Sequence, residues 1–511
     1  MQNELDEFDQ WVDLASERLG GAVLYANDDF FAEKENLLKP AAAIFIDGKY
    51  TDRGKWMDGW ESRRRREDGH DDCIVRLGAP GVVRGITIDT AHFRGNYPES
   101  ASVETCTLHG TPTTEDLLKA TWVEVVPRSK LIGDTKNRFS IAPENARRAT
   151  HLRLHIYPDG GVARLRVYGE VSADLSWMGR QGQVVDLAAV EHGASVVACN
   201  DMFFGSRHNL IMPGRSVNMG DGWETKRSRK TAPDWLLLQL AAEGTIERIE
   251  VDTNHFKGNF PESCAIEGKW AAHGATGDQL LAEEDKWLPI LERTKLQAHT
   301  RHFFSKEIAN AGPFTHLRLR IFPDGGVSRL RVHGVVTAEG RETQAISHLN
   351  EMDDRALEAE LLTCCGSRTW VKKMMSARPY TTISSLQAKH VQASTALEKD
   401  DWLEAFRAHP RIGEKKAETA TGVQAATWAK GEQANVAEAS STILDELAEI
   451  NRAYEEKFGH IYIVCATGKT AEELLAIAKE RLNNYPATEL KRAADEQRKI
   501  TDLRIAKMVS R

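Results

Sequence analysis

The stretch HLRLHIYPDGGVARLRVYG at His151–Gly169 returns as HLRLRIFPDGGVSRLRVHG at His316–Gly334, with 15 of 19 residues identical. Apolar residues alternate with polar ones on both sides of PDGG in each copy. Such alternation places one face of a strand in a core, and PDGG is turn chemistry, so each copy predicts a β-hairpin with one buried face. The copies lie 165 residues apart. Solenoid repeats have periods of only about 20–50 residues, so each copy belongs to a whole domain.

Three further phrases recur in the same order. They are NDDFF at Asn27–Phe31 and NDMFF at Asn200–Phe204, DGWESRRRR at Asp58–Arg66 and DGWETKRSR at Asp221–Arg229, and DTAHFRGNYPES at Asp89–Ser100 and DTNHFKGNFPES at Asp252–Ser263. The first pair is offset by 173 residues and the other two by 163, so the first copy has about ten extra residues between Phe31 and Asp58. Glycine and proline are frequent and long helical patterns are scarce. Residues 1–176 and 177–340 therefore predict two tandem all-β jelly-roll sandwiches of the galactose-binding-like type.

The pattern changes near residue 340 to a sequence rich in Ala, Glu and Lys. Ile443, Leu447, Ile450, Tyr454 and Phe458 recur at steps of three or four, and a glycine follows as a stop signal. A Thr-Ala-Glu-Glu capping box at 470–473 opens a further helix. Residues 345–511 therefore predict an all-α domain.

Composition excludes several classes of protein. The net charge of −8 disfavours nucleic acid and membrane surfaces as partners, since both are polyanionic. No apolar run approaches the roughly 20 residues of a membrane span, and the acidic start lacks the features of a signal peptide. Seven cysteines without CxxC spacing favour a reducing compartment, so we expect a cytoplasmic protein. A homo-oligomer is expected because paired sandwiches and small helical domains commonly self-associate.

Matched polar residues in the repeats are the candidates for chemistry. They are His92, Glu99, Asp58, Trp60, Glu61 and Arg164 in the first copy, and His255, Glu262, Asp221, Trp223, Glu224 and Arg329 in the second. Turns and surface ion pairs explain most of these residue types equally well. The string from the histidine to the glutamate is the exception, because a loop needs neither an imidazole nor a terminal carboxylate. We therefore predict His92, Glu99, His255 and Glu262 as catalytic, and the others as substrate-binding.

The four repeated phrases together resemble the allantoicase family. The resemblance covers about residues 20–338 and implies hydrolysis of allantoate to ureidoglycolate and urea. The residue types fit that reaction, since guanidinium groups pair with a substrate carboxylate and a His or Glu base activates water. A divalent metal is left open for this part, although no HxH or HExxH spacing supports one.

The helical third carries its own motifs, HPRIG, an EQ pair, FGHIYIVCATG and RLNN. Together they resemble the family of 2-oxo-4-hydroxy-4-carboxy-5-ureidoimidazoline (OHCU) decarboxylases, which implies an all-helical enzyme without a cofactor that forms (S)-allantoin. The resemblance implies His409, Glu432 and Arg481 as catalytic, with Arg481 meeting the substrate carboxylate. It also implies the following substrate contacts: Pro410, Gln433, His460, Ile461 and Tyr462. Ala429 stands where the family often has serine, which puts one substrate contact in doubt.

Other interpretations stay open at this point. The repeats could be ligand- or carbohydrate-binding sandwiches, with the helical third as an oligomerisation unit. The paired His and Glu residues favour an enzyme acting on small molecules. The sequence does not decide whether both repeats are catalytic or share one site, nor whether His409 or Glu432 donates the proton.

Overall fold

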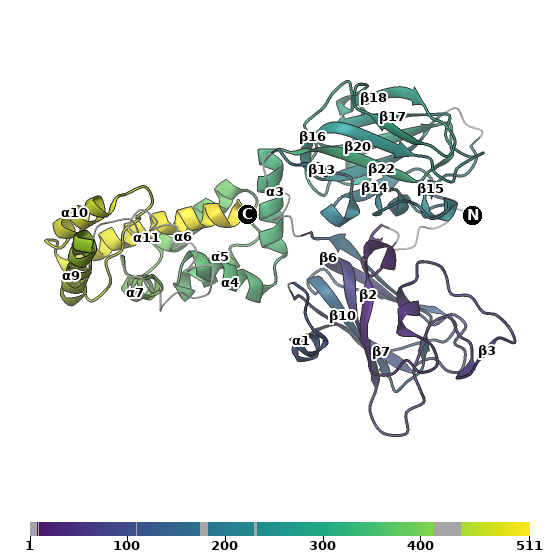
Figure 1. Ribbon diagram of the computed structural model, residues 1–511, viewed down its shortest axis with the longest axis horizontal. Coiled ribbons are helices and arrows are strands. Elements are labelled where there is room, and N and C mark those ends of the chain that lie inside the picture. Colours follow the sequence, from purple (N-terminus) through teal and green to yellow (C-terminus); the bar gives the residue numbers. More distant parts are fainter. Residues whose placement is uncertain are drawn as a thin grey trace. The chain divides into compact units, whose positions relative to one another are not determined.

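The computed structural model describes residues 8, 10–108, 110–173, 182–228, 232–412 and 441–510. The chain forms two compact units, Met1–Arg341 and Glu342–Arg511. Strands dominate the first unit and helices make up the second (Figure 1). This confirms the predicted fold class of two β-sandwiches followed by an all-α domain. No helix within the described ranges is both long and apolar enough to span a membrane.

The first repeat is an eight-stranded antiparallel sheet folded into a sandwich. Its strand order is β1 (Val12–Asp13), β12 (Arg164–Val171), β6 (Asp71–Asp89), β10 (Arg148–Tyr157), β7 (Ser100–Cys106) and β8 (Val123–Lys130). Strands β2 (Ala22–Ala26) and β9 (Lys136–Ser140) pair with β6 as well. Two small pairs complete the repeat: β5 (Trp60–Glu61) with β11 (Gly161–Val162), and β3 (Tyr50–Thr51) with β4 (Gly54–Lys55). Helix α1 (Thr114–Lys119) connects β7 to β8.

The second repeat has the same topology. Its order is β13 (Val184–Asp186), β22 (Arg329–Val336), β16 (Asp234–Asp252), β20 (Phe314–Phe322), β17 (Ser263–Lys269) and β18 (Leu288–Lys295). Strands β14 (Ser195–Cys199) and β19 (Arg301–Phe304) pair with β16, β15 (Trp223–Glu224) pairs with β21 (Gly326–Val327), and α2 (Gly277–Ala282) precedes β18. The β3–β4 pair belongs to the segment that is longer in the first copy, and among the described residues the second repeat has no such pair.

The strands around PDGG form as predicted, but the predicted hairpin is wrong. Leu152, Leu154 and Ile156 of β10 are buried, as are Leu165 and Val167 of β12. The two strands do not pair with each other; β10 lies between β6 and β7, and β12 lies between β1 and β6. Alternation reports which face of a strand is buried and carries no information about its partner. PDGG therefore carries the chain from one end of the long strand β6 to the other.

The PDGG turn needs its second glycine for space. A Cβ atom at Gly161 would lie 1.9 Å from the Phe93 ring, and the same distance separates one at Gly326 from the Phe256 ring. Both rings are fully buried. The turn therefore packs directly on the aromatic residue of the DTxHF phrase, which joins two of the repeated phrases in each sandwich.

The second unit is a helical bundle. Its helices are α3 (Ala338–Glu351, whose first turn belongs to the first unit), α4 (Asp354–Cys364), α5 (Arg368–Ser376), α6 (Ile383–Thr395), α7 (Lys399–Arg407), α9 (Ser441–Phe458), α10 (Ala471–Arg481) and α11 (Pro486–Val509). The predicted stripe on α9 is confirmed, since Leu447, Ile450 and Tyr454 are buried. The capping box at Thr470 is also confirmed: its side chain accepts from Glu473 N.

Candidate functional sites

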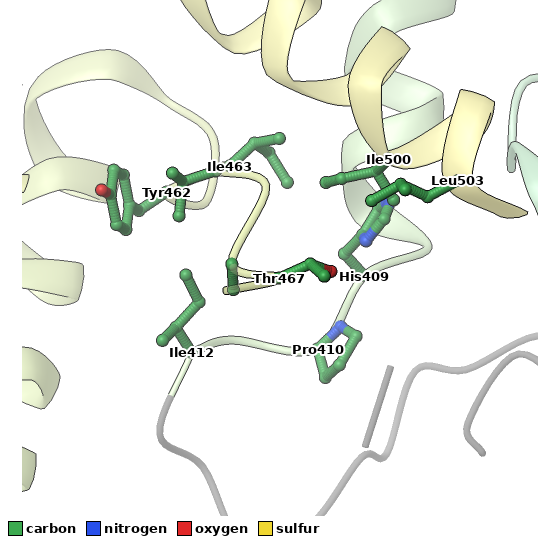
Figure 2. A pocket seen from close by; sticks show the side chains of 10 residues that line it. His409, Pro410, Ile412, Tyr462, Ile463, Thr467, Ile500 and Leu503 are labelled. Atoms are coloured by element: carbon green, nitrogen blue, oxygen red, sulfur yellow. The ribbon is translucent and has the colours of Figure 1, made fainter. Parts of the chain in front are cut away.

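A pocket that is partly open to solvent lies in the helical unit, with a volume of about 430 Å³ when the solvent space at its mouth is included (Figure 2). Three segments line it: the turn after α7, the extended stretch between α9 and α10, and one face of α11. The lining residues are His409, Pro410, Ile412, Tyr462, Ile463, Val464, Ala466, Thr467, Ile500 and Leu503. Most of the lining residues are thus apolar, and an imidazole and a threonine hydroxyl lie among them. The HPRIG and FGHIYIVCATG motifs meet here although about 50 residues separate them.

His409 is held on the turn that ends α7. Its backbone N–H donates to Phe406 O at 3.0 Å, and its side chain is buried. Burial, with the nearby positive charge of Arg504 as a second cause, lowers the pKa of His409 to about 3. A hydrogen bond with the Gln497 side chain acts in the opposite direction. The imidazole is therefore neutral around pH 7 and can act as a base or as a neutral hydrogen-bond donor.

One face of α11 supplies polar groups that the sequence analysis missed. Gln497, Thr501 and Arg504 follow one another at steps of four and three, and all three are buried. The Gln497 amide donates to Thr501 Oγ1 at 3.3 Å, and Arg504 Nη1 donates to Thr363 O at 3.3 Å. Polar residues at helical spacing on a buried face were the available signal, because a buried polar stripe is unusual unless it binds something.

Arg481 lies behind the pocket wall. Its guanidinium pairs with the fully buried Glu489 at 2.5 Å and donates to Ile463 O at 2.9 Å. Asn484 also donates to Glu489, at 2.6 Å, so the RLNN motif is built around this carboxylate. The resemblance assigned Arg481 to the substrate carboxylate, whereas the arginine that the structure places beside His409 is Arg504.

The other residues expected at this pocket divide into three groups. Pro410 and Tyr462 line it. His460 and Ile461 pack in the surrounding core instead, with the His460 ring against Phe406 and Tyr454. Glu432, Gln433 and Ala429 lie outside the described residues.

In each sandwich the four repeated phrases meet at one edge. In the first repeat, Trp60 Nε1 donates to Asp28 O at 2.8 Å, Asn96 Nδ2 to Glu61 Oε1 at 2.7 Å, and Gly161 N to Asn96 O at 2.7 Å. The second repeat repeats these bonds between Trp223 and Asp201, Asn259 and Glu224, and Gly326 and Asn259. The structure thus brings Glu61 and Glu224 into the loop cluster, while Trp60 and Trp223 are buried as its floor.

His92 and His255 occupy the same unusual position. Their φ angles are 70° and 69°, in the left-handed region that non-glycine residues rarely adopt. Nε2 of His92 lies 3.1 Å from Ala43 O, and Nε2 of His255 lies 3.0 Å from Ser216 O. A carbonyl only accepts, so in the neutral ring the proton is on Nε2 and the lone pair on Nδ1. Strained backbone at the same place in both copies is typical of a functional site.

Asp58 and Asp221 form buried ion pairs with Arg164 and Arg329. The nitrogen–oxygen distances are 2.7 and 3.0 Å, and each arginine is at most 3% exposed on its side chain. Arg164 also donates to Ala41 O and Asp58 O, at 2.9 and 3.0 Å. These bonds hold the loop that follows the NDxFF phrase. Contact of either arginine with substrate, as the sequence predicted, would require these bonds to be exchanged.

The glutamates of the repeats differ in environment. Burial is the largest influence on Glu61 and raises its pKa, while the bond from Asn96 opposes the shift. Glu99 is exposed, and Glu262 pairs with Arg293 at 3.2 Å on the surface. The structure therefore places the half-buried Glu61, and not the exposed Glu99, in the loop cluster. Within the described ranges no group of three or more His, Cys, Asp and Glu residues is arranged to hold a metal ion.

Comparison with known proteins covers both units. The family model described as "Allantoicase repeat" matches residues 12–172 and 185–337, and the model described as "OHCU decarboxylase" matches residues 350–506. Among curated relatives, probable allantoicase 1 of Burkholderia mallei is 49% identical over 330 residues, which cover 64% of this chain and 95% of that protein. Allantoicase of Dictyostelium discoideum is 49% identical over 325 residues, which cover 63% and 86%.

Solved structures match in the same two places. The crystal structure of allantoicase from Saccharomyces cerevisiae is 36% identical with a TM-score of 0.52, and the match covers 63% of this chain and 92% of that one. A crystal structure of an OHCU decarboxylase in the presence of (S)-allantoin is 39% identical with a TM-score of 0.26, and the match covers 30% and 99%.

Proposed function

This chain belongs to the allantoicase family and carries an OHCU decarboxylase domain behind its repeats, and from that premise we propose how the two activities of this enzyme are carried out. The repeats hydrolyse allantoate to ureidoglycolate and urea. The helical domain removes CO₂ from OHCU and yields (S)-allantoin. The observation that best supports the decarboxylase site is the neutral His409 at the pocket between the HPRIG and FGHIYIVCATG motifs.

Decarboxylation needs no cofactor in this scheme. The bond between the hydroxyl-bearing ring carbon and the carboxylate breaks, and its electron pair moves into the adjacent ring imine to give an enol. The hydroxyl group then gives up its proton and becomes a carbonyl, while a proton adds to the neighbouring carbon that bears the ureido group. The apolar walls formed by Ile412, Ile463 and Ile500 keep water away from the carboxylate and favour a transition state with dispersed charge. Arg504, with its positive charge near His409, is our candidate to orient the carboxylate.

His409 holds and returns the proton of the substrate's hydroxyl group in this mechanism. Its depressed pKa makes the free base the form that meets substrate. We assign Gln497 to orienting the ring, because its side chain interacts with His409 while its amide nitrogen donates to Thr501. Glu432 stays our second candidate for the proton that ends on carbon.

The decarboxylase proposal is tested in the full chain with His409→Asn. We expect CO₂ release from OHCU to fall by about 10²–10⁴-fold, the usual contribution of a proton-transfer residue, with urea release from allantoate unchanged. Retained decarboxylation in a folded variant would remove His409 from the mechanism. Loss of both activities would point to unfolding instead, and circular dichroism separates that case.

In the repeats, hydrolysis adds a water oxygen to the carbon that bears both ureido groups. The C–N bond to one of them breaks, and the leaving nitrogen takes a proton. The Nδ1 lone pair of His92 accepts the proton from water, and Glu61, whose carboxyl pKa is raised by burial, gives one to the leaving nitrogen. His255 and Glu224 have these roles in the second repeat. The convergence of the four phrases supports this assignment.

Two paired variants separate the candidate glutamates. Glu61→Gln combined with Glu224→Gln is expected to lower urea release by about 10²–10⁴-fold, whereas Glu99→Gln combined with Glu262→Gln lowers it little. The reverse pattern would show that the exposed glutamates are the acid. Decarboxylation of OHCU by the same preparations serves as the internal control for folding.

Two broader proposals concern cellular location and assembly. The seven cysteines are free, and six of them are buried, which supports residence in the reducing cytoplasm; cell fractionation tests it. Exposed apolar side chains at Ile44, Phe203 and Phe204 support self-association, which light scattering of the purified chain tests.

A further inference from the structure

The two repeats differ at the buried carboxylate of the DGWE phrase. Asp58 keeps 9% of its side chain exposed, and Asp221 keeps 3%. One oxygen of each, Oδ2, binds an arginine and the backbone N–H of a loop residue, Ile44 or Val217, both at 3.0 Å from the oxygen. The other oxygen of Asp221 has no hydrogen bond within the part of the chain that the structure describes. It faces Arg18 Nη1 at 3.1 Å.

Arg18 belongs to the first repeat. It lies on the short 3₁₀ helix Glu17–Leu19, and it also donates to Asn209 Oδ1 of the second repeat at 3.2 Å. The next residue, Leu19, packs into the core of the second repeat together with Ala79. The residue at the matching position of the second repeat is Glu191, an acid. A glutamate cannot supply the same charge to Asp58, so the contact exists in one direction only.

Two hydrogen bonds connect the Arg18–Asp221 contact to the catalytic candidate His255. Asp221 holds the backbone N–H of Val217, and the preceding carbonyl, of Ser216, accepts the proton on His255 Nε2. A buried carboxylate that loses a cation draws in water or a proton, and its remaining bonds change. Without Arg18 the Ser216–Val217 dipeptide, and with it the His255 ring, would lose a fixed position. Asp58 does not depend on the other repeat in this way, because its side chain is more exposed and the second cation near it, Lys39, belongs to its own repeat.

We propose that Arg18 is a positioning residue of the site in the second repeat, so that this site is built by both repeats while the site of the first repeat is built by the first alone. The inference rests on the proposed hydrolysis of allantoate at each repeat. It also means that the tandem arrangement is required for the second site, beyond any stabilisation of the fold.

The test measures urea release by two variants of the full chain, in each of which only one of the two repeat sites is active. Glu61→Gln isolates the second site, and Glu224→Gln isolates the first. Adding Arg18→Met to the Glu61→Gln chain is expected to lower kcat/KM by about tenfold or more, the scale of a small misplacement of a catalytic group. Adding it to the Glu224→Gln chain is expected to change nothing. Arg18→Lys, which keeps the charge, restores part of the loss.

The control is Arg84→Met, which removes a surface pair with Glu170 in the same repeat. It is expected to be silent in both backgrounds. An equal loss from Arg18→Met in both backgrounds would reduce Arg18 to a structural role, and no loss in the Glu61→Gln chain would overturn the proposal. If neither glutamine substitution alters urea release, the assignment of Glu61 and Glu224 as acids is wrong. The two variants then do not isolate the two sites, and the hydrogen-exchange measurement below decides the role of Arg18.

Hydrogen exchange then decides the question for Arg18 separately. With Arg18→Met we expect faster amide exchange over residues 212–221 and unchanged exchange over residues 39–58, the matching loop of the first repeat. Unchanged exchange over 212–221 would show that Arg18 does not hold this loop, and the proposal would be abandoned.

Discussion

Replacing Arg481 by methionine separates the two roles considered for this arginine. The change leaves Glu489 fully buried and negatively charged, with only hydroxyl and amide donors from Tyr454 and Asn484. Breaking a buried ion pair from one side typically costs about 3–5 kcal/mol. The Arg481 bond to Ile463 O is lost as well, which adds roughly 1 kcal/mol. We therefore expect a large loss of stability confined to the helical unit.

The assay is urea denaturation followed by circular dichroism at helical wavelengths, where the β-rich repeats contribute little. Arg498→Met is the matched control, since Arg498 and Asp495 form an exposed pair worth about 0–1 kcal/mol. Adding Glu489→Gln to Arg481→Met removes the uncompensated charge and is expected to recover much of the lost stability. Decarboxylation of OHCU is expected to recover with it.

Recovery of decarboxylation in the double variant Arg481→Met, Glu489→Gln decides between the two roles of Arg481. If Arg481 bound the substrate carboxylate, the double variant would regain stability but stay inactive, because the cation would still be missing. A single Arg481→Met variant as stable as Arg498→Met, with a raised KM for OHCU, would likewise refute the scaffold role. Arg504→Met is expected to show the opposite behaviour, with decarboxylation lost in a folded domain.

Three further outcomes are expected. The pKa of His409 in the folded protein is about 3, below its ordinary value of 6.5, so the histidine contributes stability above pH 6.5 that is lost as the pH falls toward 3. The measurement is the midpoint of urea denaturation of the wild type and of His409→Asn at pH 7.5 and at pH 5. We expect the midpoint to fall less between these two pH values in the variant than in the wild type. Gly161→Ala is expected to destabilise the first repeat by about 1–3 kcal/mol or more because the Cβ would meet Phe93, whereas Gly95→Ala, with nothing within 4 Å, has little effect on the melting temperature. Dialysis against EDTA is expected to leave decarboxylation at full rate, and a loss restored by a divalent metal would contradict this.

The sequence predicted those parts of the fold whose residue pattern depends on a single physical property, such as the burial of one face of a strand or helix. Duplicated phrases defined two sandwiches, alternation identified the buried faces of β10 and β12, and the spacing of apolar residues identified α9. Strand partners were not predictable in this way. The PDGG turn was expected to close a hairpin, yet β10 and β12 each pair with β6, because pairing depends on contacts far apart in the chain.

The same limit applies to the candidate site residues. His409 stands on the turn that follows α7, where its type and position predict a role in chemistry. Arg481 and Arg504 are both arginines on amphipathic helices, and a motif does not show which one lies near His409 and which one pairs with a buried glutamate.

In the repeats, duplication preserves residues for packing and for chemistry alike, so identity between the copies cannot separate the two. The asymmetry between the copies is more informative. Arg18 and Glu191 occupy matching positions with opposite charge, and only the structure shows that the arginine reaches Asp221 in the other repeat. A difference between duplicated domains therefore indicates where each depends on its neighbour, and it is at such a position that a change in one repeat is expected to alter catalysis in the other.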